Sequence, residues 1–192
     1  MGASGVAVEP VPSTYRRLCD NVRLNNLQDR VECCNVAAGA KDGTLRVTDQ
    51  RGAENRVVPS ESRAETVEVR VMPLEELWEQ AGGDHFLVVK VDVEGWEQAV
   101  VSGASRLLAR AGPTALVLEL EGGARYGFDG QDVHEELCAR GYVPVAHDPF
   151  SRELRKRDDF RRSGNTIYVS DIREATSRVK ESEKYTVIDR NI

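Results

Sequence analysis

Short apolar runs alternate with polar, helix-like segments along this chain of 192 residues. Runs of four to eight apolar residues bounded by Gly, Pro or acidic residues are typical of strands, whereas apolar residues three and four positions apart predict helices. The expected strands cover residues 6–8, 31–37, 44–48, 66–72, 86–92, 114–120, 142–146 and 166–169. The expected helices cover residues 14–25, 73–81, 100–108, 133–139 and 173–184. This alternation predicts an α/β fold with a doubly wound, mostly parallel sheet.

The run from Leu87 to Val91 ends in two carboxylates, Asp92 and Glu94, followed by Gly95 and then a helical pattern. It lacks the apolar/polar alternation of a half-exposed strand, which is typical of a parallel strand covered on both faces. In open α/β sheets, ligands bind just beyond the carboxyl ends of the strands. We therefore expect the chemistry of this protein near Asp92 and Glu94.

Other segments carry weaker signals. The polar stretch 49–65 is expected to be a loop, and Gly122, Gly123, Gly127 and Gly130 predict a second, glycine-rich loop. We expect one domain over residues 1–170, followed by a charged, largely solvated tail over residues 171–192.

Charge and composition exclude several classes of partner. The chain has 26 basic and 32 acidic residues, and its net charge of −6 argues against nucleic acid or an anionic membrane surface. No segment is apolar enough to span a membrane and no secretory signal is visible, so a cytoplasmic location is expected if Met1 is the natural start. Cysteines and histidines lack the spacing of metal ligands, so no metal site is expected. A small-molecule acceptor is the expected partner, and a homo-oligomer stays open.

Several short motifs follow one another in a specific order. They are Val8-Glu9-Pro10-Val11-Pro12, Asn21 with Asn25, Ala37 with Gly39, Pro73-Leu74-Glu75-Glu76-Leu77 and Lys90-Val91-Asp92-Val93-Glu94-Gly95. With these motifs the chain closely resembles the FkbM family of S-adenosylmethionine-dependent methyltransferases from about Val6 to Val169. The resemblance implies a class I methyltransferase fold of the Rossmann-like type. It also implies S-adenosylmethionine as cofactor and a hydroxyl oxygen of a sugar or small metabolite as acceptor.

The resemblance places part of the cofactor site in the first quarter of the chain. An acid at the tip of a strand in a nucleotide-binding half accepts hydrogen bonds from ribose hydroxyls, and Glu9 is placed to do so. The alternative is a strand-end carboxylate in water. The resemblance further implies that the adenine of the cofactor contacts Asn35, Val36 and Ala37.

The acids after the central strand are candidates for catalysis. Methyl transfer needs the attacking oxygen held in line with the leaving sulfur and its proton removed, which suits Asp92 or Glu94. One of them can instead fix the turn by accepting backbone N–H groups, and the alternative gives both acids that structural role. Glu119 ends the neighbouring strand, where it either lines the substrate pocket or caps the next loop.

One expected element of the family is absent from the sequence. Class I methyltransferases begin with a strand and a glycine-rich turn that binds the methionine part of the cofactor, and residues 1–5 are too short to supply the strand, turn and helix. This strand would lie centrally, so its loss would leave unpaired backbone groups beside both the Glu9 and the Asp92 strands.

Three interpretations of this absence stay open. The chain is a truncated part of an active enzyme, a domain completed by another polypeptide, or a degenerate domain that serves as a binding module. We favour the first, which predicts an Asp-x-Gly-Ala-x-x-Gly-like segment encoded upstream. A nicotinamide-dependent dehydrogenase is a weaker rival, because the chain has no G-x-G-x-x-G turn.

Overall fold

The computed structural model describes residues 3–49, 55–58, 65–80, 88–109, 114–160, 164–184, 186–187 and 190–191. The chain divides into two compact units. Unit 1 consists of Met1–Asp84 and Ala99–Leu107, and unit 2 consists of His85–Gln98 and Leu108–Ile192. Along the described sequence, helices alternate with strands in both units, which confirms a mixed α/β protein.

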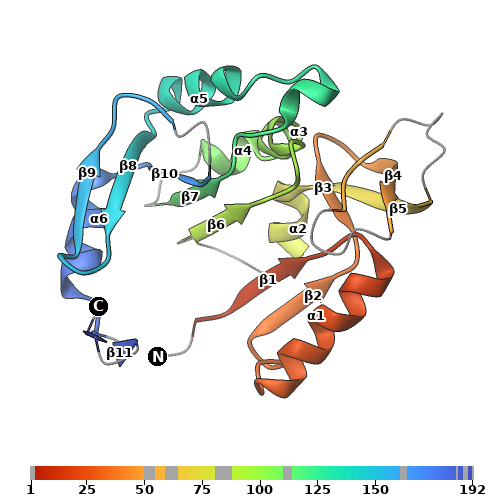
Figure 1. Cartoon of the computed structure of the whole chain (residues 1–192), viewed down its shortest axis with the longest axis horizontal. Helices are drawn as coiled ribbons and strands as arrows, with labels where there is room; N and C mark the ends of the chain where they lie inside the picture. The colour runs from red at the N-terminus through yellow and green to blue at the C-terminus, as the bar shows by residue number, and fades with distance from the viewer. Residues whose placement is uncertain are drawn as a thin grey trace. The chain divides into compact units, whose positions relative to one another are not determined.

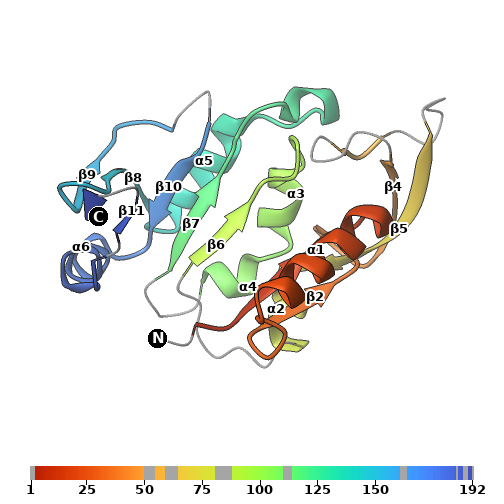
Figure 2. The same ribbon diagram turned by 60° about the horizontal axis from the view of Figure 1, so that its bottom comes forward.

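Unit 1 begins with a parallel strand pair connected by a helix. Strand β1 (Gly5–Val8) pairs with β2 (Val31–Cys34), and α1 (Pro12–Leu24) connects them. Pro12 opens α1, because its fixed φ suits the first turn of a helix and that turn needs no N–H from it. Helix α1 lies along this strand pair (Figure 2), and the Tyr15 hydroxyl donates to the Cys33 carbonyl oxygen at 3.3 Å. The expected first strand and first helix are therefore confirmed.

The expected strand over residues 31–37 is wrong in its extent, because the chain changes sheets in the middle. Strand β2 ends at Cys34, and β3 (Ala37–Gly39) pairs with β5 (Thr66–Pro73) in a separate sheet. Strand β5 also pairs, antiparallel, with β4 (Gly43–Thr48). The change of direction occurs at Asn35, whose side chain bonds to the backbone at the end of β1 instead of continuing the β2 ladder.

The three-stranded sheet carries the apolar core of unit 1. Val11, Ala37, Val47, Val69 and Val71 are all buried and pack together. The alternating pattern of residues 66–72 is thereby confirmed as a strand with one buried face. Part of the expected loop 49–65 also joins this sheet, because Val57 forms an antiparallel bridge with Val47. Residues 50–54 and 59–64 of that loop lie outside the described residues.

The helical segments that follow are shorter than the pattern predicts. Helix α2 (Leu74–Gln80) follows β5, and the stop expected at Gly82-Gly83 lies outside the described residues. The apolar face over residues 100–108 is buried as expected, but it is divided between α3 (Glu97–Ser102) and α4 (Ser105–Leu108). The break falls at Gly103, where a Cβ would lie 1.9 Å from the Gly39 carbonyl oxygen. Only glycine fits at this close backbone contact between Gly103 and Gly39.

Unit 2 is built on a five-stranded sheet of order β6-β7-β10-β8-β9 (Figure 1). Its strands are β6 (Val88–Val91), β7 (Ala115–Leu118), β8 (Val143–Asp148), β9 (Glu153–Lys156) and β10 (Thr166–Val169). The β6–β7 pair is parallel, whereas β10 pairs antiparallel with both β7 and β8, and β9 pairs antiparallel with β8.

The doubly wound, mostly parallel sheet is therefore not confirmed. The short connection between β8 and β9 makes a hairpin, which forces these strands to be antiparallel. Strand β9 was not predicted, because Leu154 is its single apolar residue between charged neighbours. It lies at the edge of the sheet, where charged side chains are common.

The remaining elements of unit 2 follow β7 and β10. They are the 3₁₀ turn η2 (Gly123–Tyr126), α5 (Gly130–Ala139), α6 (Ile172–Glu181) and the two-residue strands β11 (Thr186–Val187) and β12 (Arg190–Asn191). The tail helix α6 is capped by Asp171 and held by Arg152, whose Nε donates to the Val179 carbonyl oxygen at 2.9 Å. None of the helices in the described ranges has the length and hydropathy needed to cross a membrane.

Candidate cofactor and acceptor site

Glu9 follows β1 directly and lies at the entrance to α1. One carboxylate oxygen, Oε1, accepts the Val11 N–H at 2.8 Å, and the backbone N–H of Glu9 donates to the Cys34 carbonyl oxygen at 3.0 Å. Burial raises the pKa of Glu9, and the Val11 N–H opposes that effect. Glu9 therefore shapes the strand-to-helix turn with one oxygen. Its second oxygen has no protein partner in the described part of the chain.

Asn35 directly follows the neighbouring strand β2 and contacts the same turn. Its Nδ2 donates to the carbonyl oxygens of Glu9 and Pro10, at 2.8 and 2.9 Å. The structure thus brings Glu9 and Asn35 together within unit 1. Val36 is half-buried beside Asn35, and the side chain of Ala37 is buried in the core at 7% exposure. Their contacts with an adenine stay a prediction.

Asp92 and Glu119 occupy corresponding positions in unit 2. Val91 of β6 is paired with Leu118 of β7, so the next residue of each parallel strand is an acid. Asp92 is half-exposed and accepts from Lys90 Nζ at 2.6 Å, with both side chains in contact with solvent. A lysine within an apolar run either extends its ammonium group to solvent or pairs with an acid, and Lys90 pairs with Asp92.

The turn after Asp92 has an unusual backbone. Glu94 has a φ of 54° and Gly95 a φ of 94°, so both lie in the left-handed region. Gly95 also packs directly against the loop that follows β7, because a Cβ on it would lie 2.6 Å from the carbonyl carbon of Gly122. Glycine is therefore required at position 95 both for its φ and for this contact. The contact fixes the two strand-end loops against each other.

Glu97 is a buried acid beside the candidate site that the sequence interpretation missed. Its side chain is 3% exposed, and Oε1 accepts the N–H groups of Val93 and Gly95 at 3.1 and 3.3 Å. Burial raises the pKa of Glu97, the two N–H groups oppose this effect, and the nearby Asp92 carboxylate adds to it. An acid in the first turn of a helix was the available signal, since such residues often bond to backbone N–H groups.

This arrangement assigns the structural role to a third acid. We expected Asp92 or Glu94 to fix the turn, whereas Glu97 accepts the backbone N–H groups there. The Glu94 side chain forms no hydrogen bond or ion pair within the described residues. Asp92 is exposed and Glu94 is half-buried, and their catalytic roles stay predictions.

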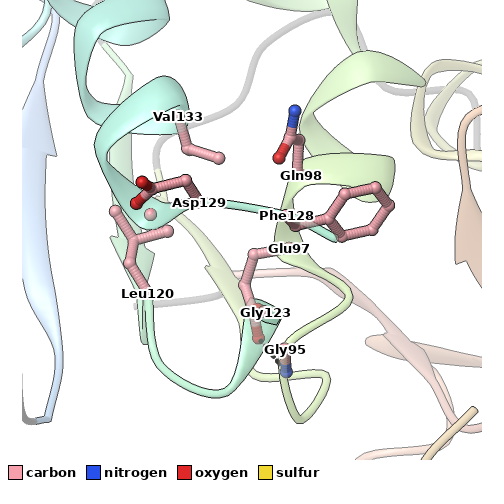
Figure 3. A pocket seen from close by; sticks show the side chains of 9 residues that line it. Gly95, Glu97, Gln98, Leu120, Gly123, Phe128, Asp129 and Val133 are labelled. Atoms are coloured by element: carbon pink, nitrogen blue, oxygen red, sulfur yellow. Dashed lines mark hydrogen bonds between the residues drawn. The ribbon is translucent and has the colours of Figure 1, made fainter. Parts of the chain in front are cut away.

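A small, shallow hollow lies beside Glu97 in unit 2. It is lined by Gly95, Glu97, Gln98, Leu120, Gly123, Phe128, Asp129, Gly130 and Val133. Figure 3 shows Phe128 across the hollow from Leu120, with the Glu97 side chain directed toward Gly95 and Gly123. The space enclosed by the hollow is only about 10 Å³, far below the roughly 300–1,000 Å³ of most small-molecule pockets, so the hollow does not hold an acceptor. Among the residues that the structure describes, no three His, Cys, Asp or Glu side chains are arranged to hold a metal ion.

Comparison with known proteins agrees with this class of architecture. The structure is similar to the crystal structure of a methyltransferase FkbM from Methylobacillus flagellatus KT, with a TM-score of 0.52 and 15% sequence identity. The match covers 88% of this chain and 43% of the other, so this chain spans less than half the length of that protein. At this identity the similarity shows the fold alone. A search of curated proteins found no match.

The sequence itself establishes the family. Residues 1–144 match the family model of the methyltransferase FkbM domain, which is most of the chain. The chain therefore belongs to the FkbM methyltransferase domain family, and the resemblance seen in its motifs is confirmed.

Proposed function

We propose that this chain is an S-adenosylmethionine-dependent methyltransferase domain that methylates a hydroxyl oxygen of a sugar or small metabolite. The observation that carries the proposal is the match of residues 1–144 to the FkbM domain. The pair of acids at equivalent ends of β6 and β7 supports it, because strand ends are where α/β folds bind their substrates.

The residues around Glu9 fit the ribose of the cofactor. The carboxylate is half-buried, it uses one oxygen within the protein, and its turn is fixed by Asn35. A carboxylate held in this way accepts hydrogen bonds from vicinal hydroxyls without a further conformational cost. When bound, S-adenosylmethionine supplies an electrophilic methyl group, and the residues near Glu9 orient its nucleoside part.

The acids of unit 2 fit the acceptor side of the reaction. A hydroxyl becomes a better nucleophile when a carboxylate accepts its proton, and Asp92 or Glu94 is placed for that task. Lys90 Nζ donates to the Asp92 carboxylate at 2.6 Å and so helps to orient it. Glu119 faces the same strand end from β7 and is the candidate for a second contact with the acceptor.

A pair of substitutions tests this division of roles. Glu9→Ala should weaken binding of S-adenosylmethionine about tenfold or more, because charge-assisted hydrogen bonds to the ribose are lost. Asp92→Asn, with Glu94→Gln as its partner variant, should leave cofactor affinity unchanged, and one of the two should lower turnover about a hundredfold. Isothermal calorimetry and a methyl-transfer assay measure these two quantities. Small and equal effects of all three variants on both quantities would contradict the assignment.

A further inference from the structure

Three aromatic residues gather beside the strand-end acids of unit 2. Trp96 follows the turn after β6, and Tyr126 and Phe128 lie in the loop after β7. The ring centroids of Trp96 lie 5.1 Å from Tyr126 and 5.3 Å from Phe128, and those of Tyr126 and Phe128 are 6.1 Å apart. We call these three residues the aromatic cluster. None of its side chains takes part in the functional assignment made above.

The aromatic cluster is less buried than most other aromatic side chains of the described residues, although Tyr15 is also half-buried and Phe150 is 59% exposed. Trp78, Tyr142, Phe160 and Tyr168 are buried in the cores, with at most 7% exposure. All three side chains of the aromatic cluster are half-buried. Each has a large apolar surface, and burial of such a surface stabilises the folded state. Adjoining aromatic surface left in contact with water is a common feature of ligand sites.

The backbone holds this surface in a fixed shape. The turn η2 is flanked by Gly122 and Gly127, with φ values of 79° and 75°, which places Tyr126 at the end of a tight loop. Gly95 packs against Gly122 and so brings Trp96 next to Tyr126. Glu97 fixes the same turn from within, through the Val93 and Gly95 N–H groups. The surface is therefore preorganised before any ligand binds.

The surrounding charges select the kind of ligand. The guanidinium carbon of Arg125 lies 5.9 Å from the centroid of the Tyr126 ring, so a protein cation already occupies that aromatic neighbourhood and disfavours a cationic ligand. Asp92, Glu94 and Glu119 disfavour an anionic ligand at the same strand ends and accept hydrogen bonds from hydroxyl groups. A neutral molecule with an apolar face and several hydroxyls meets both conditions.

From these observations we infer that the aromatic cluster is the acceptor subsite and binds the C–H face of a neutral pyranose ring. The electron-rich faces of the aromatic rings attract the weakly positive C–H groups of a sugar. The carboxylates beside the cluster accept hydrogen bonds from the hydroxyls of the sugar. This inference rests on the proposed function, and it assigns the recognition of the acceptor to Trp96, Tyr126 and Phe128.

The two tryptophans of the full chain provide a direct test. In a ¹H–¹⁵N spectrum each indole N–H gives one signal, and Trp96→Phe assigns them. Trp78 belongs to unit 1 and serves as the internal control. Titration with methyl glucopyranoside and methyl rhamnopyranoside should shift the Trp96 signal saturably and leave the Trp78 signal in place. Tetramethylammonium chloride, a cationic probe, should shift neither signal.

Variants separate the aromatic cluster from general effects. Tyr126→Leu and Phe128→Leu keep apolar bulk but remove a ring, and each should weaken glycoside binding about tenfold. Phe150→Leu makes the same change at an exposed aromatic residue away from the cluster and should leave binding unchanged. Circular dichroism confirms folding of each variant.

Each outcome bears on either the inference or the proposed function. A folded chain that binds S-adenosylhomocysteine while no glycoside shifts the Trp96 signal overturns the inference and leaves the proposed function standing. Glycoside shifts that persist unchanged in both leucine variants also overturn it. Saturable shifts that both leucine variants lose, without methyl transfer to any glycoside, support the subsite and count against the proposed function.

Discussion

Three carboxylates follow β6 within six residues, and each has a different environment. Asp92 is half-exposed and paired with Lys90, Glu94 lies on a left-handed residue of the turn, and Glu97 is buried. The buried acid is the one that bonds to the backbone, since a carboxylate removed from water needs partners for its oxygens. The more accessible acids, Asp92 and Glu94, accept no backbone N–H group in the described residues. At this scale, burial and not sequence position separates structural acids from candidate catalytic ones.

The buried position of Glu97 predicts a specific pH dependence of stability. Its pKa in the folded protein is raised from the ordinary value of 4.5, so the folded state binds this proton more tightly than the unfolded chain. The contribution of Glu97 to the free energy of unfolding is therefore fully present below pH 4.5 and is lost as pH rises through the raised pKa. A glutamine at position 97 cannot titrate, so the Glu97→Gln variant should not lose this contribution to the free energy of unfolding as pH rises. Urea unfolding of both proteins at a series of pH values measures the difference.

The same substitution at Glu32, an exposed residue of β2, controls for the removal of one negative charge. The stability of the wild type relative to Glu97→Gln should fall steadily as pH rises above 4.5. A difference between the two proteins that is constant with pH would contradict the role given to burial.

Asn35 offers a second prediction at the residue scale. Its Nδ2 holds the carbonyl oxygens of Glu9 and Pro10, so Asn35→Ala should release the turn that carries Glu9. We expect a loss of about 1 kcal/mol in the free energy of unfolding, together with weaker binding of S-adenosylhomocysteine. Asn25→Ala is a matched control, because Asn25 donates to the Asn21 carbonyl oxygen at the end of α1. Weakening of S-adenosylhomocysteine binding by both variants alike would rule out a positioning role for Asn35.

At the scale of elements, backbone contacts decide where strands and helices end. Hydrophobic periodicity predicted β1, α1, β5, β7 and α5, because each has an apolar face that packs on a neighbour. It could not predict the break between β2 and β3 or that between α3 and α4. The first depends on the side chain of Asn35, and the second on the contact between Gly103 and Gly39. Both are contacts between residues far apart in sequence, which no local pattern contains.

The contact between the loops after β6 and β7 gives a prediction at this scale. Gly95→Ala combines a φ of 94° with a Cβ only 2.6 Å from Gly122 backbone atoms, so both strain and overlap oppose it. We expect it to lower the free energy of unfolding by about 3 kcal/mol or more. Gly127→Ala has a φ of 75° but open space around the new Cβ, and should cost about 1–2 kcal/mol. Urea unfolding compares them, and equal losses would show that the loop contact contributes nothing.

At the scale of the whole molecule, the sequence predicted the protein family better than the topology of its sheets. The order of its motifs identified the family, and the match over residues 1–144 confirms it. In place of the expected doubly wound, mostly parallel sheet, the described residues form a parallel β1–β2 pair, a three-stranded sheet, a mixed five-stranded sheet and a small β11–β12 pair. In that part of the chain β1 and β6 are both edge strands. The hairpin of β8 and β9 reverses the chain, and the charged sequence of β9 gave no strand signal.

The candidate site was predictable to the same limited degree. The acids Glu9, Asp92 and Glu119 were found because they end apolar runs, and the structure places each at a strand end. Glu97 was missed because its role depends on burial and on a bent turn, neither of which is visible in a linear pattern. Glu9 belongs to unit 1, whereas Asp92 and Glu119 belong to unit 2. Binding and turnover measurements on variants of all three acids are therefore needed to test them as parts of one site.

The most direct test of the account is calorimetric titration of S-adenosylhomocysteine into the folded chain. We expect saturable binding with one site per chain, lost or strongly weakened in Glu9→Ala and retained in Asp92→Asn. A chain that is folded by circular dichroism and binds no S-adenosylhomocysteine would contradict the proposed cofactor site. That result would instead favour a methyltransferase-like domain that acts as a binding module.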